Sequence, residues 1–256
     1  MTALPRLVAF DLDDTLAPSK SAIEPRMLAA FAGLLQRTSV AVISGGNFAQ
    51  FEAQLLARLD TSAGVDETTL ARLHLLPTCG TRYERRENGA WTTVYRESLT
   101  AEQRDDALAA LREEAERLSL WEAAPWGEIL EDRGSQVTFS ALGQRAPIDA
   151  KHAWDPSGAK KNALRAAVAD RLPDLEVRSG GSTSVDITRR GIDKAYGMRK
   201  LVEHTGIQLD EMLFVGDRLD PDGNDYPVLA LGVACHAVTG WEDTADYVEG
   251  LLAARA

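Results

Sequence analysis

The chain has 256 residues, and 45% of them are hydrophobic, a fraction that can build a packed globular core. Its 28 basic and 39 acidic side chains give a net charge of −11, which argues against nucleic acid or an anionic membrane surface as the main partner. No apolar run of about 18 residues occurs, and an acidic motif follows residues 1–7 at once, so neither a transmembrane helix nor a signal peptide is expected.

Strand and helix signals alternate in the N-terminal segment. Short apolar runs predict strands over residues 7–10 and 40–43, and the second run ends at a Ser-Gly-Gly turn. Apolar residues at helical spacing predict helices over 25–36 and 48–59. Strands that alternate with helices form a parallel sheet that helices cover on both faces.

The middle of the chain mixes the two signals without strict alternation. Thr100 and Gln103 form a capping-box signature for a helix over 101–118, and a second helix is expected over 160–172. The strands expected here are 136–140, 176–177 and 183–187. This mixture is typical of an α+β domain with an antiparallel sheet, which we place at residues 83–190.

The strand–helix rhythm returns after Gly191. The expected elements are one helix and two strands, at 194–205, 212–215 and 230–235. We therefore predict an α/β protein in which residues 1–82 and 191–256 form one core domain and residues 83–190 are inserted into it.

Two carboxylates, Asp11 and Asp13, lie two residues apart directly after the first predicted strand. In a parallel sheet, the carboxyl ends of the strands border the crevice where ligands bind. Two close carboxylates repel each other unless a cation lies between them, so the pair indicates a hard metal ion such as Mg²⁺. The pair also favours divided roles, with one carboxylate as nucleophile and the other as acid and base. For this motif alone, the alternative is an acidic turn that caps a strand.

Three further segments follow predicted strands or begin a predicted helix. Ser44 and Gly45 follow the second strand, where a hydroxyl and exposed N–H groups can hold phosphate oxygens. Lys194 begins a helix, where its charge can neutralise a phosphoryl group in transfer. Asp217 and Asp225 follow the next strand and can complete an oxygen site for the metal. Each segment alone is also compatible with an ordinary turn, a solvated lysine or an acidic loop.

The order of these four segments along the whole chain resembles the haloacid dehalogenase superfamily of phosphotransferases. The insert lies between the second and third segments, the placement of the type II caps of that superfamily. The resemblance implies a Rossmann-like core with a parallel sheet, and an inserted α+β cap of type IIB (C2b) with an antiparallel sheet.

Several stretches resemble the eukaryotic-type phosphomannomutases within that superfamily. Residues 133–143 are similar to their Arg-Asn-Gly-Met-Leu-Asn-Val-Ser-Pro-Ile-Gly, and residues 180–186 to their Gly-Gly-Gln-Ile-Ser-Phe-Asp. Residues 191–194 are similar to Gly-Trp-Asp-Lys, and the run from Gly216 to Asp225 is similar to Gly-Asp followed by Pro-Gly-Gly-Asn-Asp.

This resemblance implies a role for each matching side chain. The residues expected to act on the phosphoryl group are the nucleophile Asp11, the acid and base Asp13, and the oxygen-holding Ser44, Gly45 and Lys194. The expected ligands of Mg²⁺ are Asp11, the backbone carbonyl of Asp13, Asp217 and Asp225. The residues expected to hold a small phosphorylated sugar are Lys20, Arg133, Arg145, Ser184 and Asp186.

Two positions depart from the family pattern. Gln144 stands where the family has an arginine, and Arg145 falls one place later, where a side chain of a strand turns to the other face. Asp222 replaces a glycine in the metal loop. Arg133 and Arg145 are equally compatible with solvated surface arginines.

Two activities fit these observations, and a third interpretation is a non-catalytic binding module. With a sugar phosphate as acceptor, the enzyme is a mutase that interconverts hexose 6-phosphate and hexose 1-phosphate, with a hexose 1,6-bisphosphate activator as an option. With water as acceptor, it is a sugar-phosphate phosphatase. The similarity of the insert favours the mutase, Gln144 favours the phosphatase, and the intact acidic motifs disfavour the binding module.

Cysteines and histidines add no further site. Cys79 and Cys235 lie far apart, which predicts two buried thiols in a cytoplasmic protein rather than a disulfide framework or a zinc site. The four histidines show no ligand spacing, so structural or surface positions are expected. A homodimer is an option that the sequence leaves open.

Overall fold

The polypeptide divides into two compact units. The computed structural model describes residues 4–62, 64–180 and 182–254. The first unit comprises Met1–Arg96 and Asp193–Ala256, and the second comprises Glu97–Ile192. The chain therefore leaves the first unit once and returns to it once.

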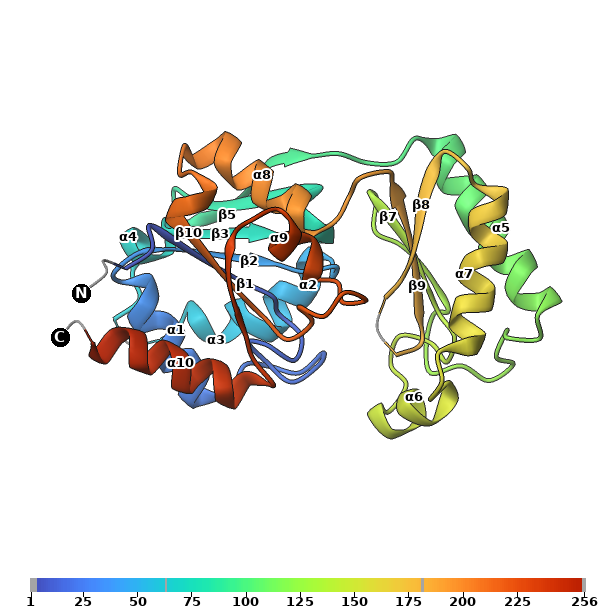
Figure 1. Ribbon diagram of the computed structural model, residues 1–256, viewed down its shortest axis with the longest axis horizontal. Helices are drawn as coiled ribbons and strands as arrows, with labels where there is room; N and C mark the ends of the chain where they lie inside the picture. The colour runs from blue at the N-terminus through green and yellow to red at the C-terminus, as the bar shows by residue number, and fades with distance from the viewer. Residues whose placement is uncertain (1–3, 63, 181, 255–256) are drawn as a thin grey trace. The chain divides into compact units, whose positions relative to one another are not determined.

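A seven-stranded sheet forms the centre of the first unit (Figure 1). Its strand order is β11-β10-β1-β2-β3-β4-β5. The parallel strands are β1 (Leu7–Phe10), β2 (Ser39–Ile43), β3 (Leu73–Leu76), β10 (Met212–Gly216) and β11 (Ala234–Ala237). An antiparallel hairpin at one edge consists of β4 (Arg82–Glu87) and β5 (Ala90–Arg96). The parallel sheet that the alternating signals predicted is confirmed.

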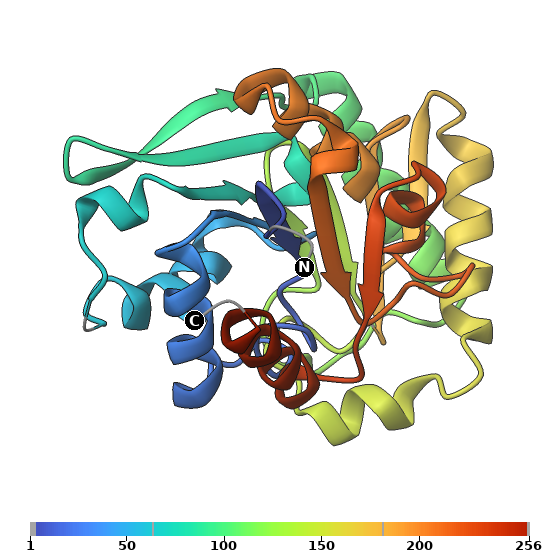
Figure 2. The same cartoon turned by 60° about the vertical axis from the view of Figure 1, so that its left-hand side comes forward.

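Helices cover both faces of this sheet, because side chains of each strand alternate between the faces (Figure 2). They are α1 (Pro25–Leu35), α2 (Phe48–Phe51), a π-helical turn (Glu52–Leu56), α3 (Ala57–Leu59), α4 (Glu67–Leu70), α8 (Lys194–Thr205), α9 (Tyr226–Ala230) and α10 (Trp241–Ala253), with 3₁₀ turns at Thr78–Gly80 and Leu209–Glu211. Val8 and Phe10 of β1 pack in an apolar cluster with α1 and α10. Leu7 and Ala9 point to the other face and pack with α8 and α9.

Two expectations about the first unit differ from the structure. The strand expected over 230–235 is wrong over its first part, because Ala230 ends α9 and Gly232 turns the chain with a φ of +88° before β11 begins. The helix expected over 48–59 contains the π-helical turn Glu52–Leu56, a form that apolar spacing does not reveal.

The β4–β5 hairpin belongs to the first unit. β4 pairs with β3, with His74 opposite Arg85 and Leu75 opposite Glu84. The second unit therefore begins at Glu97, whereas the sequence placed the start of the insert at residue 83. β5 is largely exposed, so its sequence carries no apolar alternation that would assign it to the core sheet.

A four-stranded antiparallel sheet, two long helices and one short helix build the second unit (Figure 1). In spatial order the strands are β6 (Leu130–Asp132), β7 (Gln136–Ser140), β9 (Ser184–Arg189) and β8 (Leu175–Ser179). The helices are α5 (Ala101–Arg117), α6 (Ile148–Trp154) and α7 (Ala159–Arg171). Apolar side chains of α5 and α7 form one cluster with β7, β8 and β9. The predicted capping box is confirmed, since Thr100 and Gln103 exchange two hydrogen bonds of 3.1 Å at the start of α5.

Within the described residues neither Cys79 nor Cys235 forms a disulfide, and each is half-buried rather than fully buried as expected. Across the part of the chain that the structure describes, no helix combines the length and the apolar character needed to cross a membrane.

His74 on β3 is a buried histidine of the first unit, and its Nδ1 lies 2.6 Å from the hydroxyl of Tyr83. Burial, with a smaller contribution from the charge of Arg85, lowers the pKa of His74 from 6.5 to about 3. Below pH 6.5 the unfolded chain binds a proton here that the folded protein does not bind. The contribution of neutral His74 to stability is therefore complete above this pH and is lost progressively as the pH falls.

Acidification from pH 7 to pH 5 is expected to lower the free energy of unfolding by about 2 kcal/mol through His74 alone. His74→Gln keeps a hydrogen-bonding side chain beside Tyr83 but does not titrate, so it should lose this part of the pH dependence. Urea denaturation of both proteins at the two pH values measures the difference. An equal pH dependence in wild type and variant would contradict the prediction.

Candidate active site

The motifs of the first unit meet at the carboxyl edge of its parallel sheet. β1 lies between β2 and β10 in parallel register, and the N–H of Asp11 continues the ladder by donating to the carbonyl of Val215 at 3.0 Å. Asp11, Ser44 and Asp217 therefore follow three neighbouring strands at one edge, where α/β sheets bind ligands.

Lys194 is the first residue of α8 and lies inside this acidic edge. Asp193 caps the helix by accepting a hydrogen bond from the N–H of Tyr196 at 2.9 Å, which fixes where the helix begins. The Nζ of Lys194 lies 2.6 Å from Oδ1 of Asp11 and 2.5 Å from Oδ1 of Asp225. The three side chains are 1%, 6% and 0% exposed, so a buried ammonium bridges two buried carboxylates.

Three carboxylates outnumber the one ammonium in this cluster. Burial raises the pKa of Asp11 well above its usual value, and the charges of Asp225 and Asp217 add to the rise while Lys194 opposes it. Burial and Asp225 likewise raise the pKa of Asp217. Burial alone would lower the pKa of Lys194, but Asp11 and Asp225 outweigh it and raise that pKa. Lys194 therefore stays charged, and three carboxyl groups share its single positive charge.

Asp11, Asp217 and Asp225 suit a hard divalent cation. One oxygen of each carboxylate lies within 4.8 Å of the other two. Mg²⁺ prefers such oxygens, and its charge would favour the ionised form of these carboxyl groups. Glycine at position 216 leaves room for the Asp225 carboxylate. A Cβ at this position would collide with that carboxylate and lie 2.7 Å from Cε1 of Phe214. The donor set therefore fits Mg²⁺.

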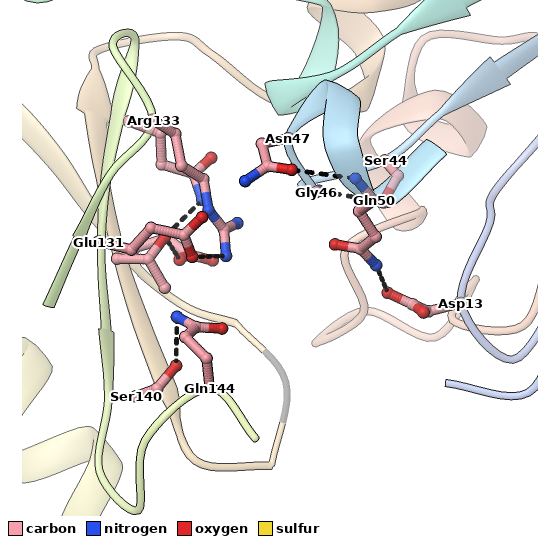
Figure 3. A network of polar contacts seen from close by, with 12 residues as sticks. Asp13, Ser44, Gly46, Asn47, Gln50, Glu131, Arg133, Ser140 and Gln144 are labelled. Carbon is pink, nitrogen blue, oxygen red and sulfur yellow. Dashed lines mark hydrogen bonds and ion pairs between the residues drawn. The ribbon is translucent and has the colours of Figure 1, made fainter. Parts of the chain in front are cut away.

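The Asp13 side chain is held by three N–H donors. The backbone N–H of Lys20 donates to Oδ1 at 2.7 Å, and Nε2 of Gln54 donates to the same oxygen at 3.0 Å. Nε2 of Gln50 donates to Oδ2 at 2.8 Å (Figure 3). Lys20 has a left-handed backbone with a φ of +56°, and the hydrogen bond to Asp13 comes from its backbone.

The sequence alone does not single out Gln50 and Gln54. They lie four residues apart on the helical segment after β2, a spacing that places both on one face. Their partner Asp13 is 37 and 41 residues away in the chain, so local spacing alone does not connect these amides with it.

Ser44 and Gly45 begin the turn between β2 and α2. Ser44 is buried, and its Oγ accepts a hydrogen bond from the N–H of Gly46 at 3.1 Å. Asn47 then caps α2 by accepting from the N–H of Gln50 at 3.0 Å (Figure 3). A Cβ on Gly46 would collide with the Gln50 amide, so glycine allows this amide to lie against the turn.

Two residues predicted to bind substrate, Ser184 and Asp186, lie on β9 of the second unit. Asp186 is opposite Thr138 on β7 and accepts a hydrogen bond from its Oγ1 at 2.7 Å. Ser184 is opposite Ser140. Thr138 and Ser140 are each 2% exposed, so this face of the small sheet carries a row of buried polar groups.

Arg133 precedes β7 and is largely buried. Its side chain is 9% exposed, and its guanidinium pairs with Oε2 of Glu131 at 2.8 Å (Figure 3). The solvated surface position that the sequence left open for Arg133 is therefore wrong.

Gln144 and Arg145 diverge after β7. Nε2 of Gln144 donates to Oγ of Ser140 at 3.0 Å (Figure 3). Arg145 is exposed, its N–H donates to the carbonyl of Trp126 at 2.7 Å, and its guanidinium lies beside Gly127. An amide rather than a guanidinium thus lies against Ser140.

Asp222, the other departure, lies in an exposed loop, and its N–H donates to Oδ1 of Asp220 at 3.2 Å. Gly181 of the 180–186 stretch lies outside the described residues.

Residues 124–254, just over half of the chain, match the family model of eukaryotic phosphomannomutase. The chain belongs to the eukaryotic phosphomannomutase family. The matched segment contains Lys194, Asp217 and Asp225 together with the four-stranded sheet of the second unit. The phosphomannomutase resemblance noted in the sequence is confirmed. A probable phosphomannomutase of Caenorhabditis elegans is 26% identical over 260 residues, which cover 96% of this chain and 95% of the relative.

Solved structures share the fold. An N-terminally truncated IMP-nucleotidase of Plasmodium falciparum superposes with a TM-score of 0.71 at 12% identity, covering 97% of this chain and 70% of the other. A haloacid dehalogenase-like hydrolase from Bacteroides thetaiotaomicron gives 0.63 at 16% identity, covering 96% and 99%. The predicted haloacid dehalogenase fold is thus confirmed, and the family match makes this chain a phosphotransferase of the phosphomannomutase family. Such enzymes generally use Mg²⁺, which agrees with the three grouped carboxylates.

Proposed function

We propose that this chain interconverts hexose 6-phosphate and hexose 1-phosphate through an aspartyl phosphate on Asp11. The observation that carries the proposal is the buried contact of Lys194 with Asp11, beside Asp217. Positioning and charge neutralisation supply most of the catalysis of phosphoryl transfer. A buried ammonium next to a carboxylate nucleophile allows that carboxylate to approach an anionic phosphoryl group.

The residues at the sheet edge divide the reaction between them. Asp11 attacks phosphorus in line, and the bond from phosphorus to the sugar oxygen breaks as the bond to Asp11 forms. Asp13 gives a proton to the leaving oxygen and later takes one from the acceptor hydroxyl. Lys194 holds one phosphoryl oxygen, and the hydroxyl of Ser44, whose Oγ already accepts from Gly46, can donate to another.

Mg²⁺ is the proposed cofactor of this reaction. Its ligands would be Asp11, Asp217 and Asp225 with the backbone carbonyl of Asp13, and when bound it would neutralise charge on the phosphoryl oxygens.

The second unit, Glu97–Ile192, is proposed to select the sugar. Ser184 and Asp186 offer acceptors and donors for sugar hydroxyls on the polar face of its sheet. Arg133 offers a guanidinium for the phosphate that does not react, and its ion pair with Glu131 orients it.

A sugar-phosphate phosphatase is the second candidate, and Gln144 favours it. Its neutral amide lies against Ser140 where the family places an arginine. An amide binds phosphate less tightly than a guanidinium does, so a sugar bisphosphate would be held more weakly. Water could then replace the sugar hydroxyl as acceptor.

Phosphorus NMR with Mg²⁺ and mannose 1-phosphate or glucose 1-phosphate separates the two activities. Each substrate is incubated with and without a catalytic amount of hexose 1,6-bisphosphate. The expected result is bisphosphate-dependent formation of the 6-phosphate with little inorganic phosphate. Inorganic phosphate without isomerisation would identify a phosphatase, and the absence of both products would contradict the proposed transfer. The homodimer and the cytoplasmic location stay predictions from the sequence.

A further inference from the structure

Asp13 accepts hydrogen bonds on both carboxylate oxygens from the amides of one helical segment, and Figure 3 shows the one from Gln50. Nε2 of Gln54 lies 3.0 Å from Oδ1, and Nε2 of Gln50 lies 2.8 Å from Oδ2. The backbone N–H of Lys20 adds a donor to Oδ1 at 2.7 Å. Each oxygen has at least one donor, so any rotation of the carboxylate group would weaken hydrogen bonds on both sides.

Gln54 adopts its orientation although one of its polar atoms is left unsatisfied. The residue is 2% exposed, and its amide nitrogen donates both to Asp13 and, at 3.1 Å, to the carbonyl of Ser21. Its Oε1 is buried and accepts no hydrogen bond within the described residues. A buried acceptor without a partner destabilises the folded state, so other interactions must offset it. Turning the amide over would place Oε1 against the Asp13 carboxylate, where two acceptors repel each other.

Gln50 reaches Asp13 from α2, the helix that directly follows the turn that carries Ser44. The N–H of Gly46 donates to Oγ of Ser44 at 3.1 Å, and the same glycine leaves the space in which the Gln50 amide lies. Gln54 follows in the π-helical turn Glu52–Leu56, and such turns are frequent at functional sites. The segment after β2 therefore fixes both Ser44 and the donors to Asp13.

We propose that Gln54 and Gln50 are positioning residues that hold the Asp13 carboxylate at the angle from which it meets the sugar oxygen. The inference rests on the proposed function, since it requires Asp13 to exchange a proton with that oxygen. Both amides act through Asp13 and are assigned no contact with the phosphoryl group. A purely structural role, in which Gln54 only ties Ser21 to the helix, makes a different prediction.

The test is a single turnover with enzyme and Mg²⁺ in excess over two different phosphoryl donors. The hexose 1-phosphate that the NMR experiment shows to be consumed releases a sugar oxygen that must gain a proton. 4-Nitrophenyl phosphate releases a stable phenolate that leaves without one. Gln54→Met keeps the length of the side chain but removes both donors. We expect release of the sugar to slow by roughly 10- to 100-fold and release of the phenolate to change far less.

Two further variants keep the result interpretable. Gln36→Met also replaces a glutamine amide by a thioether, but near the amino end of β2, where Gln36 donates to the carbonyl of Gly64 at 2.8 Å. This variant should leave both rates unchanged. Gln50→Met changes a half-buried position and should slow release of the sugar in the same selective way. Thermal unfolding shows which variants fold. If Gln54→Met does not fold, the two rates of Gln50→Met test the inference in its place.

A selective loss with the sugar donor supports the inference. Equal losses with both donors, or unchanged rates in the folded variants, would overturn it. The wild-type protein is measured first, because a failure to release phenolate would refute the proposed transfer to Asp11 itself and, with it, this inference.

Discussion

Replacing Lys194 by methionine is expected to lower the free energy of unfolding by about 3–5 kcal/mol. The Nζ of Lys194 lies 2.6 Å from Asp11 and 2.5 Å from Asp225, and none of these side chains is more than 6% exposed. Methionine fills a similar volume but leaves these carboxylates and Asp217 without the ammonium. Buried like charges without a counter-charge destabilise the folded state. Urea denaturation in the presence of EDTA measures the loss.

Lys200→Met is the matched control, because Lys200 lies on the same helix. Its Nζ pairs at 2.9 Å with Glu203, whose side chain is 63% exposed, and such a pair contributes only about 0–1 kcal/mol. Mg²⁺ should stabilise Lys194→Met more than wild type, because a divalent cation replaces part of the missing positive charge. Equal unfolding free energies for the Lys194 and Lys200 variants would contradict the role assigned to Lys194.

The acidic edge of the sheet can be predicted from the sequence because topology alone brings its parts together. Asp11, Ser44 and Asp217 each follow a strand, and parallel strands end at the same edge. The start of α8 can also be predicted from the sequence, since Asp193 provides the cap that makes Lys194 the first helical residue.

Features that depend on distant partners cannot be predicted in this way. Gln54 has the spacing of an ordinary helical residue, and only the folded chain brings it to Asp13, 41 positions away. The hairpin β4–β5 joins the core sheet through pairing with β3, although its own residues are polar and largely exposed on β5.

Asp11→Asn is expected to reduce turnover by roughly 10⁴-fold or more. An amide is too weak a nucleophile to form the acyl phosphate through which every transferred group passes in the proposed reaction. Lys194 keeps Asp225 at 2.5 Å in this variant, so the ammonium is not left without a counter-charge. The phosphorus NMR assay measures turnover, and thermal unfolding measures stability. Retained turnover would refute Asp11 as the nucleophile.

Asp246→Asn provides the matched substitution at the surface, where the Asp246 side chain is 67% exposed on α10, and it should retain full turnover.

The change in stability of Asp11→Asn distinguishes a loss of the nucleophile from a loss of folding. Burial and the charges of Asp225 and Asp217 raise the pKa of Asp11, so its neutral replacement removes repulsion from the cluster. We therefore expect Asp11→Asn to unfold at the same or a higher temperature without Mg²⁺. A nucleophile held among like charges lowers the stability of the folded protein. Its neutral replacement is therefore expected to lose turnover while the stability stays unchanged or increases.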